Sequence, residues 1–191
     1  MRFVFDLLLA SAIGLVVGLG SAKYAVENGA RVDATRIGPW VASPRAGTPH
    51  ADPYSAAAFA RTGEIALGPG EGLAFIAVND SGGRELNGAC SYAIAGSMPA
   101  ARLWTLTAVD ANGLVATGNG FHRGLHSQEV LRDRGGDVTI TVSTTARSGN
   151  WLSLRDPGAF RLVLRLYDTP LASGENLARP TLPEIKREDC R

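Results

Sequence analysis

The chain has 191 residues, of which 45% are hydrophobic, 19% charged and 7% aromatic. This composition supports one packed domain and excludes wholesale disorder, collagen-like repeats and coiled coils. The formal net charge is only +1, because 19 Lys and Arg residues stand against 18 Asp and Glu residues. The chain therefore lacks the positive field that nucleic-acid binding needs, and we expect no nucleic-acid partner.

An apolar segment opens the chain. Residues 3–26 are hydrophobic throughout except for Asp6, Ser11, Ser21, Lys23 and the weakly polar Tyr24. A helix of about 20 apolar residues crosses a bilayer, so we predict a transmembrane anchor over residues 1–26 and a polar stalk over residues 27–36. The small residues Gly20-Ser21-Ala22 also suit a signal peptidase, so secretion to the periplasm after signal cleavage is the alternative. A buried core helix is disfavoured because the segment carries no polar stripe.

The two cysteines, Cys90 and Cys190, lie far apart in the sequence. Neither has a Cys or His at metal-ligand spacing, which favours one structural disulfide over two unpaired thiols. Structural disulfides form and persist in oxidising compartments. We therefore expect a single-pass inner-membrane protein with the bulk of its chain in the periplasm.

One short helix is expected early in the globular part, which begins near Ile37. Asp52 is a good N-cap acceptor and Pro53 suits the first helical turn. Gly63 suits the position just after the last turn, where the backbone adopts a left-handed conformation. These three residues predict a helix over residues 54–61.

From residue 64 onward, apolar residues recur with period two, which is typical of β-strands. The alternation predicts strands at residues 73–77, 104–108, 137–143 and 160–167. Turns rich in Gly, Asn, Asp and Ser separate them, at residues 79–83, 112–113 and 134–137. Residues 37–191 therefore predict a mainly β domain, which is a sandwich, jelly roll or barrel. The tail from Pro180 is expected to lie extended on its surface.

Five short motifs follow one another along this domain. They are Gly38-Pro39-Trp40, Asp52-Pro53-Tyr54-Ser55, Ala60-Arg61-Thr62-Gly63, Asn150-Trp151-Leu152, and Leu164-Arg165-Leu166-Tyr167 with Pro170. In this order they resemble the bacterial family called domain of unknown function twelve-fourteen, which often lies C-terminal to domain of unknown function twelve-fifty-four. The resemblance implies a jelly-roll-like antiparallel β-sandwich and, in short members that begin with an apolar helix, a membrane-associated protein. It implies no established reaction. Ser153 departs from the family, whose members commonly have Pro there.

A candidate ligand-binding surface lies on the last predicted strand. Arg161 and Arg165 alternate with leucines and share a face with Tyr167. Arginine forks bind planar anions and stack on rings, so this face suits a carboxylate, a sugar or an anionic membrane surface. A solvated outer face is the plainer interpretation. With the motif residues Asn150 and Trp151, the candidate ligand-binding set is Arg165, Tyr167, Trp151 and Asn150.

A candidate divalent-metal site is the other chemical signal. His122 and His126 are four residues apart, a spacing that places both on one face of a strand or helix, and Glu129 is a third candidate ligand. A glycine-rich polar loop with exposed histidines is the plainer interpretation, and no cofactor is otherwise expected. The sequence contains neither a phosphate-binding loop nor a Gly-x-Ser-x-Gly nucleophile elbow.

These features favour an envelope protein whose β domain binds a protein partner or a small polar ligand, rather than an enzyme. One alternative is a metal-dependent or carbohydrate-processing enzyme that uses His122, His126 and Glu129 with Arg165. The other is a structural module that forms homo-oligomers through an exposed sheet edge. Membrane contact is expected through residues 3–26 in the anchored form.

Overall fold

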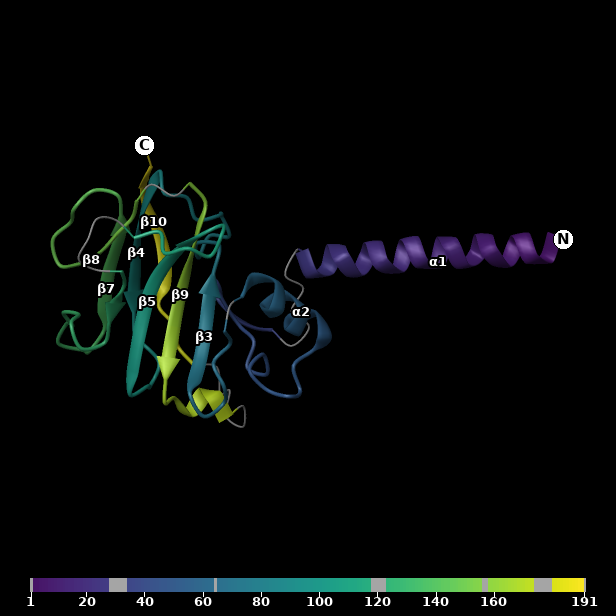
Figure 1. Cartoon of the computed structure of the whole chain (residues 1–191). Coiled ribbons are helices and arrows are strands. Elements are labelled where there is room, and N and C mark those ends of the chain that lie inside the picture. Colours follow the sequence, from purple (N-terminus) through teal and green to yellow (C-terminus); the bar gives the residue numbers. More distant parts are fainter. Residues whose placement is uncertain are drawn as a thin grey trace.

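Two β-sheets and a long N-terminal helix make up the computed structural model, which describes residues 2–27, 34–63, 65–117, 123–155, 158–173 and 180–190 (Figure 1). The helical elements are α1 (Arg2–Glu27), α2 (Pro53–Thr62) and the 3-10 helix η1 (Pro170–Ser173). The strands are β1 (Thr35–Ile37), β2 (Trp40–Ala42), β3 (Gly72–Ala77), β4 (Cys90–Gly96), β5 (Leu103–Asp110), β6 (Leu125–His126), β7 (Val138–Ser143), β8 (Asn150–Ser153), β9 (Phe160–Tyr167) and β10 (Glu184–Cys190).

The larger sheet has the strand order β1-β2-β3-β9-β5-β6, and the smaller sheet has the order β10-β4-β7-β8. The strand pairs of the described chain are antiparallel, except that β7 and β8 run parallel. The four strands predicted from alternation are confirmed as β3, β5, β7 and β9. The predicted mainly β sandwich is therefore confirmed.

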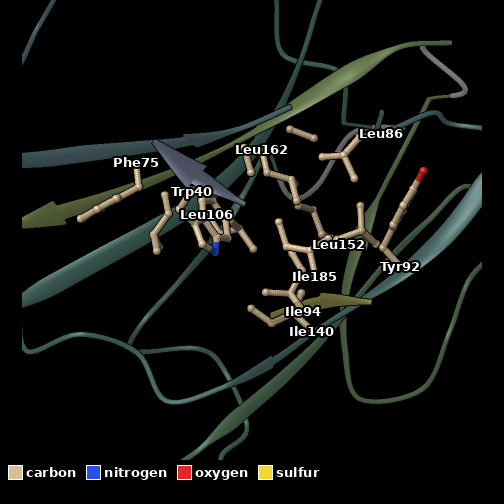
Figure 2. Packing of buried hydrophobic residues seen from close by; sticks show 14 of the residues in the cluster. Trp40, Phe75, Leu86, Tyr92, Ile94, Leu106, Ile140, Leu152, Leu162 and Ile185 are labelled. Atoms are coloured by element: carbon tan, nitrogen blue, oxygen red, sulfur yellow. The ribbon is translucent and has the colours of Figure 1, made fainter. Parts of the chain in front are cut away.

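The core lies between the two sheets, and Figure 2 shows its side chains pointing toward one another. Its largest fully buried members are Trp40, Tyr92, Phe75, Leu86, Ile94, Leu106, Ile140, Leu152, Leu162, Leu164, Leu166 and Ile185. Each such apolar side chain stabilises the fold by roughly 1.5–3 kcal/mol relative to an exposed one. The buried indole N–H of Trp40 has a hydrogen-bond partner, because Nε1–H donates to the Pro183 carbonyl at 2.8 Å.

The predicted short helix is confirmed as α2, with the expected caps. The Asp52 carboxylate accepts hydrogen bonds from the backbone N–H groups of Tyr54 and Ser55, both at 3.0 Å. At the other end Gly63 has φ +67° and donates its N–H to the Phe59 carbonyl at 2.9 Å. Both helix ends are therefore satisfied by local residues, as the sequence pattern predicted.

The C-terminal tail is extended, as predicted, but it is also the edge strand β10 of the smaller sheet. β10 pairs with β4, and Ile185 at its start is fully buried. Local pattern could not show this because the strand carries one large apolar residue among charged ones. The Cys90–Cys190 disulfide joins the two strands, which confirms the predicted bridge.

The loop after β3 also holds β10, through a buried ion pair. The side chain of Asp80 is 1% exposed, and its Oδ2 lies 2.9 Å from Nε of Arg187 on β10. Its Oδ1 accepts hydrogen bonds from the backbone N–H groups of Gly82 and Arg84. Burial raises the pKa of Asp80, but the Arg84 N–H and the Arg187 guanidinium outweigh it, so the pKa lies below its ordinary value.

The apolar helix predicted at the N-terminus is confirmed as α1. Its most apolar 18-residue window has a mean hydropathy of 2.2, and it is long enough to cross a membrane. It buries no residue against the sandwich and extends away from it beside α2 (Figure 1). The predicted stalk spans residues 27–36, of which 28–33 lie outside the described residues and Thr35 and Arg36 belong to β1.

Candidate functional site

Strand β9 presents two arginines on the face of the larger sheet that points away from the core. Phe160, Leu162, Leu164 and Leu166 belong to the core between the sheets, so the alternate positions Arg161, Val163 and Arg165 lie on the other face. Val163 is buried there as well, at 2% exposure. Val163 forms a small apolar cluster with Ile76 and Val109 from the flanking strands. The two arginines therefore lie on either side of a narrow apolar strip.

A groove of about 670 Å³ lies over this face, and we call it the arginine groove. Three arginines line it: Arg61 from the last turn of α2, and Arg161 and Arg165 from β9. The lining also includes Gly63, Ile65, Val109, Asn112, Gly113 and Leu114. Among the described residues, no carboxylate lines the groove. Glu64, which precedes Ile65 in the sequence, lies outside the described residues.

The hairpin turn after β5 forms one wall of the groove beside Arg161. Asp110 holds this turn by accepting the N–H groups of Asn112 at 2.8 Å and Leu114 at 2.9 Å. Gly113 has φ +80°, and a Cβ at this position would lie 3.3 Å from an Arg161 terminal nitrogen. Glycine therefore serves both the turn and the close approach of the guanidinium. This is one of the turns predicted from the sequence, at residues 112–113.

The guanidinium groups of the groove retain unused donors. The Nε atom of Arg161 is buried and has no hydrogen-bond partner among the described residues. No described group forms a hydrogen bond or ion pair with the Arg165 side chain. Arg61 places Nη1 3.3 Å from Oε1 of Glu27, an exposed pair that leaves its other N–H groups available. Three cations with spare donors in one groove are suited to bind an anion.

The predicted ligand-binding set is divided between the two sheets. Arg165 lines the groove, and Tyr167 lies farther along the same face of β9 without lining it. Asn150 and Trp151 lie on β8 of the smaller sheet. The structure therefore does not bring these four residues together.

The polar groups of β8 have backbone partners instead. The Asn150 amide accepts from the Leu131 N–H at 2.7 Å and donates to the carbonyls of Leu131 and Thr139. Trp151 donates Nε1–H toward the Ser143 carbonyl at 3.2 Å. These bonds attach β8 to its neighbours, so both side chains stabilise the strand.

The candidate metal ligands are only partly placed. His122 lies outside the described residues. The His126 ring accepts the Gln128 N–H on Nδ1 at 3.3 Å, and its Nε2 lies 3.3 Å from Oε2 of Glu129. The other Glu129 carboxylate oxygen, Oε1, accepts a hydrogen bond from the backbone N–H of His126 at 2.8 Å, which closes a local turn. Within the described part of the chain, no three His, Cys, Asp or Glu side chains gather as a metal site would require.

The sequence predicted a binding face with Arg161 and Arg165, but it did not predict that Arg61 belongs to the same site. Arg61 occurs in a motif of the family resemblance, yet that motif only marked the end of a helix. Its partners in the groove come from a strand far along the chain. No local sequence pattern indicates that residues so far apart in the chain lie close together in space.

By its fold and its site, the protein is a β-sandwich with an apolar N-terminal helix and a cationic groove. Residues 71–171 match the family described as "Protein of unknown function (DUF1214)". Because the match spans more than half of the 191 residues, the chain belongs to this family, as its motifs predicted.

A solved structure shares the fold. The VPA0106 protein from Vibrio parahaemolyticus superposes with a TM-score of 0.61 at 20% identity, over 96% of this chain and 46% of that one. An uncharacterised protein from Burkholderia cenocepacia has a TM-score of 0.47 at 18% identity, over 96% of this chain and 52% of the other. This chain thus spans about half the length of these proteins. No curated protein sequence matches it.

Proposed function

We propose that the protein is a membrane-anchored envelope protein whose β-sandwich binds a small anionic ligand in the arginine groove. One observation carries the proposal: Arg61, Arg161 and Arg165 line the same groove, and its described lining holds no carboxylate. Arg61 has the Glu27 carboxylate as a counter-charge, but Arg161 and Arg165 have no such partner in the described lining. A bound anion would offset the repulsion among the three cations.

The proposed location rests on α1 and the disulfide. α1 is the single-pass anchor in the inner membrane, and the sandwich lies in the periplasm. The length and hydropathy of α1 suit a membrane-spanning role. An oxidising periplasm supports the Cys90–Cys190 bridge, which would not persist in a reducing cytoplasm.

The chemistry of the groove favours carboxylate or phosphate over a neutral sugar. Arginine binds either anion through two parallel charge-assisted hydrogen bonds, which are roughly twice as strong as neutral ones. The volume of about 670 Å³ lies within the usual range for small-molecule sites. The described lining contains no His, Cys, Ser or acidic side chain, so we assign it a binding role and no reaction.

Calorimetric titration of the full chain in neutral detergent tests this proposal, with inorganic phosphate and succinate as the probes. We expect saturable binding that weakens as salt rises. The double variant Arg161→Gln/Arg165→Gln should bind at least tenfold more weakly, because hydrogen bonds to charged groups contribute about 1.5–3 kcal/mol each.

The matched control is Arg102→Gln, which removes one positive charge from an exposed pair with Asp168 outside the groove. It should bind both probes as the wild type does. Absence of binding by the wild type, or an equal loss in the control, would contradict the proposal.

A further inference from the structure

The rim of the arginine groove is aliphatic and exposed. Ile65 is 89% exposed and Leu114 is 66% exposed, and both line the same groove as the arginines. They come from different segments, since Ile65 follows α2 and Leu114 follows β5. Single exposed apolar residues are ordinary on protein surfaces, but a pair flanking a cationic groove matches a ligand with a charged group and an apolar part.

The groove also lies beside the end of α1. Arg61, one of its three cations, pairs with Glu27, the last residue of α1. Figure 1 shows α2 between the end of α1 and the larger sheet, and α1 and α2 are in contact. Lys23 and Tyr24 near this end are the kinds of residue that mark a membrane interface. With α1 in the bilayer, the groove lies near the lipid head groups.

We infer that the arginine groove binds the head group of an anionic phospholipid from the adjacent leaflet. Arg161 and Arg165 bind the phosphate, and Ile65 and Leu114 contact the aliphatic part of the lipid. Glu27 orients Arg61 toward the same head group. This inference rests on the proposed function and names its ligand class.

A fluorescent short-chain phosphatidylglycerol, titrated into the full chain in neutral detergent, tests the inference by fluorescence anisotropy. Phosphatidylcholine with the same chains and inorganic phosphate are the competitors. We expect phosphatidylglycerol to bind at least tenfold more tightly than either, because phosphatidylcholine lacks the net charge and phosphate lacks the apolar part.

Two sets of variants separate the two contributions. Arg161→Gln/Arg165→Gln should abolish the preference for phosphatidylglycerol over phosphatidylcholine. Ile65→Ser/Leu114→Ser should weaken phosphatidylglycerol binding at least fivefold and leave phosphate binding unchanged. The control Leu131→Ser changes a leucine that is 69% exposed and lies outside the groove lining, and it should have no effect. Thermal unfolding of each variant checks that it is folded.

The outcomes distinguish this inference from the proposed function. If phosphate binds and phosphatidylglycerol binds no more tightly, the lipid inference is overturned and the small-anion site stands. If phosphatidylglycerol and phosphatidylcholine bind equally, the lipid inference is also overturned, because the charge plays no part. If neither phosphate nor phosphatidylglycerol binds, both proposals fail.

Discussion

Arg187 on β10 and the three arginines of the arginine groove have different surroundings. On β10 the side chain of Arg187 is 14% exposed and lies against the Asp80 carboxylate, with Nη1 3.6 Å from Cys90 Sγ and Cζ 5.3 Å from the centre of the Tyr92 ring. It also donates to the Glu85 carbonyl. In the arginine groove, by contrast, three arginines share one space without a described carboxylate in the lining.

The difference shows how to separate a structural arginine from a binding one. A buried charge costs much desolvation free energy unless a counter-charge and hydrogen bonds offset it, and Arg187 has both. Arg161 and Arg165 have donors that the described protein does not use. Loss of Arg187 or its partners should therefore reduce stability, whereas loss of the groove arginines should reduce binding.

The largest expected effect comes from the disulfide that closes the Arg187 region. Cys90 and Cys190 are 100 residues apart, and a loop of that length corresponds to about 4.7 kcal/mol in the chain-entropy model. Cys90→Ala/Cys190→Ala should lower the free energy of unfolding by nearly this amount, measured by urea denaturation. Adding a reductant should do the same to the wild type and nothing to the variant. An unchanged denaturation midpoint would contradict the prediction.

Asp80→Asn should have the next largest effect. The substitution leaves Arg187 largely buried without a carboxylate, which costs about 3 kcal/mol when a buried pair is broken. Asp168→Asn is the matched control, because it removes the carboxylate of an exposed pair and should cost less than about 1 kcal/mol. Equal losses in urea denaturation would show that burial of Asp80 does not matter.

The pH dependence of stability should follow from the same carboxylate. The folded-state pKa of Asp80 lies below its ordinary value of 3.8, so its stabilising contribution is present above that value. It is lost as pH falls through the folded-state pKa. The free energy of unfolding should therefore fall less steeply with acidification in Asp80→Asn than in the wild type below about pH 4. Parallel curves would contradict this assignment.

A smaller loss of stability is expected from a change at the N-cap of α2, the helix that carries the groove residue Arg61. Asp52→Ala removes the N-cap acceptor and should cost about 1 kcal/mol. Because Arg61 lies in the last turn of this helix, phosphate binding should also weaken, though less than in the double arginine variant. Glu188→Ala, at an exposed position of β10, should change neither the unfolding midpoint nor binding.

The smallest effect on stability is expected from Arg165→Gln. Its side chain has no described ion pair or hydrogen bond, so the free energy of unfolding should change by less than about 0.5 kcal/mol. Arg187→Gln, the same substitution in the other region, should cost several times more. If thermal unfolding shows similar losses for both variants, Arg165 has a structural role and the distinction between the regions fails.

Much of the fold could be predicted because its signals are local. Asp52, Pro53 and Gly63 bracket α2, and alternation in β9 separates its buried leucines from Arg161 and Arg165. The disulfide was predictable because the chain has only two cysteines. The smaller sheet was harder to predict. Buried residues in β4 are nearly continuous, and β8 pairs with β7 in parallel, so neither strand shows a simple alternating hairpin pattern.

The sequence by itself determined the class of fold, the apolar helix, the cysteine pair and the outward face of β9, because backbone geometry links neighbouring residues. Only the tertiary structure brought Arg61 to Arg161 and Arg165, and placed Asn150 on the other sheet. The register of β3 and β5 on β9 and the path of the chain through α2 decide those neighbours. Such long-range contacts depend on how the two sheets pack against each other around their shared core, and no short stretch of sequence encodes that packing.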